Sequence, residues 1–417
     1  DHELLRIRPF ELADRWKAPR MEVLGALLHA AHAEILNLSW DTLCPHCRVP
    51  SSRKAKLGDL ADESICDACD LTYSTDFDAA VEVTFQVHAS IRAVEPVKFC
   101  MGSPSKRKGL VFQQVLQPRE TREVSLALPA GDYVMMRADS ENRVHFHVGD
   151  GGARYAARID HDGVSRTELS HPGRGLGANA FVMESALDAP VRVALALGST
   201  TADTCSAAMV TTFQDFRELF SAEVLSPGVQ LSRASVTLLF TDLKSSTAMY
   251  QSHGDSAMYA RVRDHFEVLI AAVRVEGGGV VKTIGDAVMA SFPTPAAGVR
   301  AAIAMQKGIA KRNAERGTPE RTVQLGLHAG PCLVVNANDR LDYFGNTVNQ
   351  SARIEGQSKG GDVVVTDVVA KDPEVAALLS ASGLEVTTFE TQLKGLAGSF
   401  LLTRIEILPP ARAAAAS

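Results

Sequence analysis

The sequence predicts an α+β protein with more than one domain, and three observations support this fold class. Apolar residues recur at spacings of three and four near the start of the chain, which predicts helices. Apolar and polar residues alternate between residues 78 and 200, which predicts strands. Residues 235–406 alternate strand-like and helix-like runs. The 417 residues exceed one ordinary domain, so two or three are expected.

Composition narrows the classes of function. Hydrophobic residues make up 46% of the chain, and the net charge of -6 provides no basic field for nucleic acid. No apolar run approaches the roughly 20 residues that span a bilayer, and the start does not read as a signal peptide. We therefore expect a cytoplasmic protein with neither a membrane nor a nucleic acid as its partner. Because the chain begins with Asp1 and not Met, the native N-terminus need not be included.

Residues 3–40 are expected to be helical. Pro9 begins one helix and Pro19 begins a second, whose apolar stripe comprises Val23, Leu24, Leu27, Leu28, Ala31, Ile35 and Leu36. Two helices joined by a short turn resemble a helix-turn-helix motif. Lys and Arg do not crowd the second helix, so an ordinary helical hairpin is the favoured interpretation.

Four of the seven cysteines form two Cys-x-x-Cys pairs with 18 residues between them, namely Cys44, Cys47, Cys66 and Cys69. In a chain without a secretion signal, this spacing favours a tetrahedral Zn²⁺ site over disulfides. The segment has few large apolar residues, so the zinc would be structural and would stabilise a zinc-ribbon-like fold. The alternative is a ribbon of reduced cysteines that has lost its ion.

The middle of the chain is expected to form an antiparallel β domain of the sandwich or barrel type, with strand runs such as residues 80–88. A short helix around Phe213–Phe220 belongs to the connector that follows. The predicted units are a helical hairpin with the cysteine pairs, the β domain, a helical linker, a C-terminal α+β domain and a disordered tail, which cover residues 1–75, 76–205, 206–234, 235–406 and 407–417.

Two carboxylates in the C-terminal domain predict a metal site. Asp242 ends a run of β formers and is followed by the helix-start residues Ser245, Ser246 and Thr247, where free backbone N–H groups favour a phosphate. Asp286 follows Gly285 in a hairpin-like turn. Carboxylate oxygens suit Mg²⁺ or Mn²⁺. Either Asp alone reads as a turn or capping residue, but together they indicate metal-assisted polyphosphate chemistry.

A further motif carries nitrogen-bearing side chains. Asn349 and Arg353 lie four residues apart on a helix that is predicted to begin at Asn346, so both project from one face. An amide and a guanidinium there could clamp a ribose and a phosphoryl group. Lys394, beside the glycine turn at Gly395, could reach a phosphate.

Residues 235–406 resemble the catalytic domain of class III nucleotide cyclases, over about two-fifths of the chain and with the motifs in the expected order. The resemblance implies a ferredoxin-like βαββαβ core that dimerises head to tail with active sites at the interface. It implies that Asp242 and Asp286 bind two Mg²⁺ or Mn²⁺ ions per site and that Lys282 and Asp342 read the purine. It also implies that Asn349 orients the ribose, that Arg353 stabilises charge on the α-phosphoryl group, and that Lys394 holds the terminal phosphates.

The base-reading pair favours adenine on chemical grounds. A Lys ammonium donates to adenine N1, and an Asp carboxylate accepts from the N6 amino group. Guanine presents the reverse pattern, and each polar group left unpaired costs roughly 1–3 kcal/mol. The expected function is therefore an adenylate cyclase that converts ATP to 3′,5′-cyclic AMP and pyrophosphate, with guanylate cyclase as the alternative.

The family's metal carboxylates and its Asn, Arg and Lys residues belong to opposite subunits of each site. This chain carries both sets, so a homodimer with two equivalent sites is expected. The N-terminal half is expected to regulate the enzyme in response to an unidentified small molecule or protein.

One position departs from the family pattern. Gln324 stands where many members carry an Arg that contacts the triphosphate, which leaves Lys394 as the main cationic anchor and puts efficiency in doubt. Gln324 also supports a second hypothesis, in which the domain binds a nucleotide as a non-catalytic sensor. A zinc-dependent DNA-binding regulator is a third hypothesis, against which the overall acidity weighs.

Overall fold

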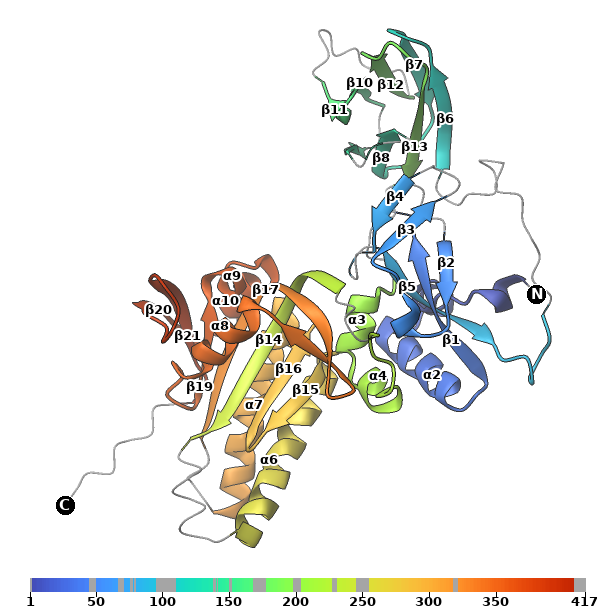
Figure 1. Cartoon of the computed structure of the whole chain (residues 1–417). Helices are drawn as coiled ribbons and strands as arrows, with labels where there is room; N and C mark the ends of the chain where they lie inside the picture. The colour runs from blue at the N-terminus through green and yellow to red at the C-terminus, as the bar shows by residue number, and fades with distance from the viewer. Residues whose placement is uncertain are drawn as a thin grey trace.

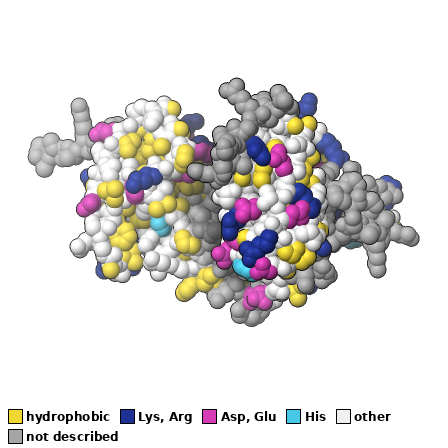
Figure 2. Space-filling view, turned by 90° about the horizontal axis from the view of Figure 1, so that it is seen from above, with side chains coloured by type: hydrophobic (Ala, Val, Ile, Leu, Met, Phe, Trp, Pro, Cys, Tyr) yellow, Lys and Arg dark blue, Asp and Glu magenta, His cyan; other side chains and the backbone are white. Residues whose placement is uncertain are grey.

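The computed structural model describes residues 2–44, 50–66, 71–75, 78, 80–94, 110–137, 140, 142–149, 152–167, 178–197, 204–226, 231–244, 255–317 and 322–408. Figure 1 shows a β-sandwich at one end of the molecule, a large sheet with helices at the other, and a smaller α/β region between them. The predicted α+β fold class is confirmed. In this part of the chain, none of the helices combines the length and the apolar character that crossing a bilayer demands. Basic and acidic side chains are interspersed on the coloured surface in Figure 2.

The N-terminal region packs two helices on a three-stranded antiparallel sheet of order β2-β1-β5. Its elements are η1 (His2–Leu5), α1 (Pro9–Trp16), α2 (Arg20–His32), β1 (Leu36–Leu43), β2 (Pro50–Lys54), η2 (Leu57–Asp59) and β5 (Val81–Val87). A small hairpin of β3 (Glu63–Cys66) and β4 (Leu71–Ser74) is attached to it. Trp40 and Phe85 lie fully buried in its core.

The prediction that residues 3–40 are helical is wrong beyond His32, and β1 begins at Leu36. Leu36, Leu38 and Trp40 also alternate with polar residues, and β1 pairs with β5, so the strand periodicity prevails there. The run 80–88, which was expected in the β domain, forms β5 in this N-terminal sheet because of that pairing.

A buried charge network fixes the start of the chain to this sheet. Asp41 on β1 and Glu82 on β5 are register partners, and neither side chain is exposed. Arg6 donates to both carboxylates, at 2.7 Å to Asp41 and 2.5 Å to Glu82. Arg53 and Arg8 complete the compensation at 2.7 Å and 2.8 Å, respectively. Buried charges are costly unless paired in this way, so the network specifies how residues 6–8 lie on the sheet.

Two four-stranded sheets form the sandwich, in the orders β11-β10-β12-β7 and β6-β13-β8-β9. Most pairs are antiparallel, but β10 and β12 run parallel. Phe146, Tyr155 and Phe181 form an aromatic cluster in the core. The strands are β6 (Leu110–Leu116), β7 (Thr121–Leu126), β8 (Gly131–Arg137), β9 (Arg143–Val148), β10 (Arg154–Asp160), β11 (Gly163–Arg166), β12 (Asn179–Ser185) and β13 (Val191–Leu197).

Two short linker helices, α3 (Ala207–Thr212) and α4 (Gln214–Leu219), lie between the N-terminal region and the C-terminal sheet (Figure 1). The Ser206 hydroxyl caps α3 by accepting a hydrogen bond from the Met209 N–H at 3.2 Å.

The C-terminal domain has the βαββαβ order that was predicted. Its sheet runs β15-β16-β14-β17-β19-β21-β20, and β18 pairs with the far part of β17. Helices α6 and α7 cover one face, where Leu239 and Phe292 are buried, and α8 lies on the other face. The elements are β14 (Leu231–Leu243), α6 (Asp255–Val275), β15 (Gly279–Ile284), β16 (Ala287–Phe292), α7 (Pro295–Arg316), β17 (Val323–Ala337), β18 (Arg340–Phe344), α8 (Asn346–Glu355), β19 (Asp362–Thr366), α9 (Asp367–Ala370), α10 (Pro373–Ser382), β20 (Glu385–Thr391) and β21 (Phe400–Glu406).

Candidate active site

Two carboxylates lie close together at one end of the central strands. Asp242 is near the end of β14, and Asp286 follows Gly285 in the turn between β15 and β16. Gly285 has a φ of 64°, a left-handed conformation that favours glycine, so this hairpin needs Gly before the Asp. Burial raises the pKa of Asp242, and the negative charge of Asp286 raises it further. The two carboxylates therefore repel one another in the folded chain.

The donor set around these carboxylates fits a divalent cation. Asp286 Oδ2 is buried and accepts no hydrogen bond from any residue that the structure describes. A buried carboxylate oxygen normally has a donor or a metal ion. Hard cations such as Mg²⁺ and Mn²⁺ would satisfy this oxygen and relieve the repulsion with Asp242.

Glu355 is a third carboxylate at this place that sequence reasoning missed. It ends α8, and burial together with the charge of Asp242 raises its pKa to about 7. A Glu at the end of a helix is typical of a solvent-exposed side chain, so its position in the sequence does not distinguish it. The signal that could have revealed it is Gly326 in β17, because a Cβ there would lie 2.1 Å from the Glu355 backbone nitrogen. A glycine in a strand often marks such a close approach of another backbone.

Two glycines seat α8 on β17. Besides Gly326, Gly330 lies under the first turn of the helix, where a Cβ would be 2.8 Å from Thr347 Oγ1. The same hydroxyl donates to the Pro331 carbonyl at 2.5 Å. Both ends of α8 are thus held against the strand, which fixes the direction in which the helix presents its other side chains.

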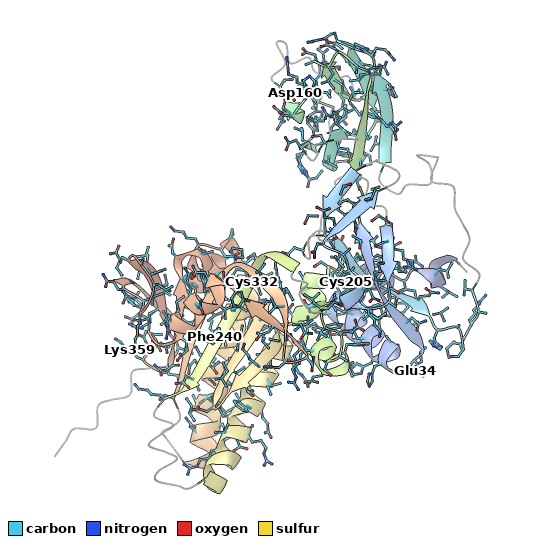
Figure 3. The ribbon with its side chains drawn as sticks, in the orientation of Figure 1. Glu34, Asp160, Cys205, Phe240, Cys332 and Lys359 are labelled. Carbon is cyan, nitrogen blue, oxygen red and sulfur yellow. The ribbon has the colours of Figure 1, made fainter. Side chains whose placement is uncertain are left out.

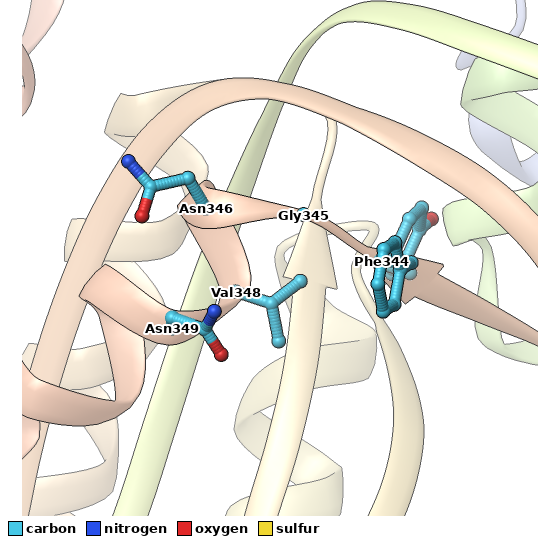
Figure 4. Close-up of a pocket in the computed structure, with 6 residues that line it drawn as sticks. Phe344, Gly345, Asn346, Val348 and Asn349 are labelled. Atoms are coloured by element: carbon cyan, nitrogen blue, oxygen red, sulfur yellow. The ribbon is translucent and has the colours of Figure 1, made fainter.

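Asn349 and Arg353 are both exposed on α8, as their spacing predicts. Lys394 is exposed in the segment between β20 and β21. Neither an ion pair nor a side-chain hydrogen bond joins any of these three to the rest of the described chain. Asn349 lines a hollow with Tyr343, Phe344, Gly345, Asn346 and Val348. Figure 4 shows Phe344 at the end of β18 near Val348 and Asn349 on the first turn of α8.

The two predicted base-reading residues meet in space. Lys282 on β15 and Asp342 on β18 are 60 residues apart in the sequence, and the Lys282 Nζ lies 2.5 Å from Asp342 Oδ2. Asp342 Oδ1 accepts from the Tyr343 backbone N–H at 2.8 Å. One ammonium and one carboxylate are therefore presented side by side, with further Lys protons and carboxylate lone pairs left for a ligand.

Gln324 lies opposite Asp242 in the register of β14 and β17. Its side-chain amide donates to the Ser358 carbonyl at 2.5 Å. This hydrogen bond engages the Gln324 amide within its own chain. Ser245, Ser246 and Thr247, the predicted phosphate-binding residues, lie outside the described residues.

One cysteine of each predicted zinc-binding pair reaches the same small cluster. Cys44 and Cys66 are buried with Tyr73 and Ala80. Burial raises the pKa of Tyr73, and the nearby thiols of both cysteines contribute to the rise. Their partners Cys47 and Cys69 lie outside the described part of the chain. The convergence of two cysteines from separate Cys-x-x-Cys pairs fits the donor chemistry of a zinc site.

His328, in the Gly-x-His-x-Gly segment of β17, gives a pH-dependent prediction. It is buried beside the Thr366 hydroxyl at 3.0 Å, and burial lowers its pKa to about 4. The unfolded chain, with a His pKa near 6.5, binds a proton between about pH 6.5 and 4 that the folded chain does not. The contribution of His328 to the free energy of unfolding should therefore be fully present above pH 6.5. It should fall by roughly 3 kcal/mol towards pH 4. Comparing unfolding free energies of wild type and His328→Gln across this range should show a flatter curve for the variant; parallel curves would contradict it.

Comparison with known proteins gives this site a context. Residues 229–395 match the family model described as the adenylate and guanylate cyclase catalytic domain, and residues 1–100 match a family of unknown function. The adenylate cyclase of Lachancea kluyveri is 29% identical over 167 residues, which cover 34% of this chain and 9% of that protein. The adenylate cyclase of Anabaena cylindrica is 31% identical over 156 residues, which cover 34% of this chain and 31% of that protein. The chain thus spans less than a third of either relative.

Among solved structures, an adenylate cyclase from Trypanosoma brucei in its monomeric state is 25% identical, with a TM-score of 0.36. The alignment covers 42% of this chain and 91% of that one.

Proposed function

Because residues 229–395 belong to the nucleotide cyclase catalytic-domain family, we propose that this chain is an adenylate cyclase that converts ATP to 3′,5′-cyclic AMP and pyrophosphate. The observation that carries the choice of ATP is the contact between Lys282 and Asp342. The pair offers a donor for adenine N1 and an acceptor for the N6 amino group, and guanine would leave both unsatisfied.

Each of the site side chains would have its own role when the ribose 3′-hydroxyl attacks the α-phosphorus in line and pyrophosphate leaves. Asp242 and Asp286 would hold two Mg²⁺ or Mn²⁺ ions, which when bound lower the pKa of the ribose 3′-hydroxyl and neutralise the pyrophosphate. Asn349 would orient the ribose so that its hydroxyl lies in line. Arg353 would stabilise the charge that develops on the α-phosphoryl group, and Lys394 would hold the terminal phosphates.

The proposal includes a homodimer. Asn349, Arg353 and Lys394 are exposed and lack a polar side-chain partner among the described residues, as expected of groups that act on a site completed by a second copy. The exposed apolar side chains of Ile284 and Phe344 lie beside the Gly285 turn and the α8 start, where a partner would cover them.

A direct assay tests the activity. The full chain is incubated with Mn²⁺ and either ATP or GTP, and cyclic nucleotides are quantified by mass spectrometry. Cyclic AMP formation with a clear preference for ATP is the expected result. Preferential cyclic GMP formation would replace the proposal by guanylate cyclase. Nucleotide binding without either product would favour the non-catalytic sensor.

Exchanging the base-reading pair should relax or reverse the base preference. In a Lys282→Glu/Asp342→Asn double variant, Glu accepts from guanine N1–H and the Asn amide donates to O6. With two mismatches created for adenine, each worth about 1–3 kcal/mol, the ATP-over-GTP ratio of kcat/KM should fall by about 100-fold. The Lys311→Glu variant, which changes the same charge on the exposed face of α7, serves as the control. An unchanged ratio in the double variant would refute the adenine assignment.

The N-terminal cysteines are proposed to hold one structural Zn²⁺ per chain. Metal analysis of purified protein should give one zinc per chain, and Cys44→Ser should lower this content and the melting temperature. Cys332→Ser is the matched control, because Cys332 is a buried cysteine in the C-terminal sheet. Equal zinc contents in the two variants would argue against the site.

A further inference from the structure

The linker helix α4 is hydrogen-bonded to the strand that carries Lys282. The Gln214 side chain is buried, and its Oε1 accepts a hydrogen bond from the Val280 backbone N–H at 2.7 Å. Val280 lies two residues before Lys282 on β15, the edge strand of the sheet, and the strand bulges between these two residues. The Gln214 Nε2 donates to Glu218 at 2.7 Å, which fixes the orientation of the amide.

The same helix also contacts the strand that carries Asp342. Arg217 Nη1 donates to the Leu341 carbonyl at 3.1 Å, and its guanidinium lies 5.6 Å from the centre of the Tyr343 ring. Leu341 and Tyr343 are the two neighbours of Asp342. Arg217 Nε donates at 2.8 Å to the Thr211 carbonyl, so the guanidinium is held in place by its own linker.

The linker and β15 are packed without spare room. A Cβ on Gly279, at the start of β15, would lie 2.3 Å from the Thr212 carbonyl oxygen and 2.9 Å from Arg217 Cδ. Only glycine lets the linker backbone approach the strand so closely. The linker helices and β15 are therefore in direct van der Waals contact, so a displacement of α3 or α4 would displace β15.

The N-terminal region packs on the other side of α4. The rings of Phe216 and Trp40 meet edge to face at 5.7 Å, and Asp215 lies 3.8 Å from His29 of α2. One hydrophobic cluster extends from the N-terminal core through the linker to Leu341 and Tyr343. Figure 3 labels Cys205 at the N-terminal side of this cluster and Cys332 on the C-terminal sheet.

We propose that Gln214 and Arg217 are positioning residues for purine recognition, which set the separation of Lys282 and Asp342 from outside the catalytic domain. The inference rests on the proposed function, because it takes Lys282 and Asp342 as the base-reading pair. Both positioning residues precede residues 229–395, the segment that matches the cyclase family. The N-terminal region would then alter nucleotide affinity and base choice by moving α4, without touching the metal carboxylates.

Binding of 3′-deoxy-ATP and 3′-deoxy-GTP tests this by calorimetry, because these probes lack the attacking hydroxyl and cannot be cyclised. For Arg217→Ala we expect about tenfold weaker 3′-deoxy-ATP binding and a smaller preference over 3′-deoxy-GTP, since a hydrogen bond and a ring contact are lost. In the cyclase assay, KM for ATP should rise while kcat changes little. Gln214→Ala should also weaken 3′-deoxy-ATP binding, reduce the base preference and raise KM. If one of the two variants fails to fold, the other still tests the inference.

Arg158→Ala is the control, because it removes an Arg that is paired with Glu184 in the β-sandwich, away from the linker and from the base-reading strands. It should retain wild-type affinity and base preference, and melting temperatures verify that all variants fold. If folded Arg217→Ala and Gln214→Ala keep the wild-type affinity and selectivity, the inference is overturned while the proposed function stands. If the wild type binds neither probe and makes no cyclic AMP, the proposed function fails and this inference with it.

Discussion

An Asp286→Asn variant is expected to lose about 100- to 1000-fold in the rate of cyclic AMP formation and to remain folded. Asparagine keeps the shape of the side chain but removes the charge that a divalent ion requires. Asp286 Oδ2 is buried without a hydrogen-bond donor in the described structure, and the charge of Asp286 raises the pKa of Asp242. Removing that charge relieves repulsion, so the melting temperature in metal-free buffer should stay level or rise. Cyclic AMP is quantified by mass spectrometry and melting by calorimetry.

A complementation experiment separates a shared site from a site within one chain. Arg353→Ala should also be inactive, since it removes the cation proposed for the α-phosphoryl group. When the two inactive variants are co-expressed, random pairing gives one half mixed dimers with one intact site each. About a quarter of wild-type activity should then return. Purified mixed dimers that remain inactive would contradict the sharing of sites between subunits.

Local signals were sufficient to predict the elements that carry the site. The apolar β run before Asp242 forms β14, and the Gly285–Asp286 turn joins β15 to β16. The helix expected from Asn346 is α8. Each of these depends on a short periodicity or on a glycine with positive φ, which a few neighbouring residues determine. The helix predicted through residue 40 failed because the same apolar residues satisfied two periodicities, and pairing with β5 decided between them.

The remaining parts of the site depend on contacts between distant segments. The approach of Glu355 to Asp242 follows from how α8 lies on β17, and no motif near Glu355 indicates it. Gln214 and Arg217 belong to a six-residue helix whose own sequence only suggests a connector. Their hydrogen bonds reach residues 66 and 124 positions away. Such partners are chosen by tertiary packing, which residue spacing does not encode.

Replacing Gly326 by alanine should reduce both stability and activity through the position of α8. A Cβ at this residue would lie 2.1 Å from the Glu355 backbone nitrogen and 2.4 Å from its Cα. Backbone atoms cannot rotate away as a side chain does, so the end of α8 must move off β17. Overpacking of this kind costs about 1–3 kcal/mol. Because Asn349 and Arg353 ride on this helix, a displacement near 1 Å should lower kcat about 100-fold. Chemical unfolding and the cyclase assay measure the two effects.

Gly356→Ala is the matched control, one residue beyond Glu355. Among the residues that the structure describes, its added Cβ would meet only the Arg353 carbonyl oxygen, at an ordinary 3.7 Å. The residue has a φ of −63°, which alanine adopts freely. Gly356→Ala should therefore retain the stability and rate of the wild type. Since Gly326 lies in an extended strand, its replacement adds no backbone strain, and the contrast isolates the volume beneath α8. If Gly326→Ala were as active and as stable as Gly356→Ala, close seating of α8 on β17 would not govern the site.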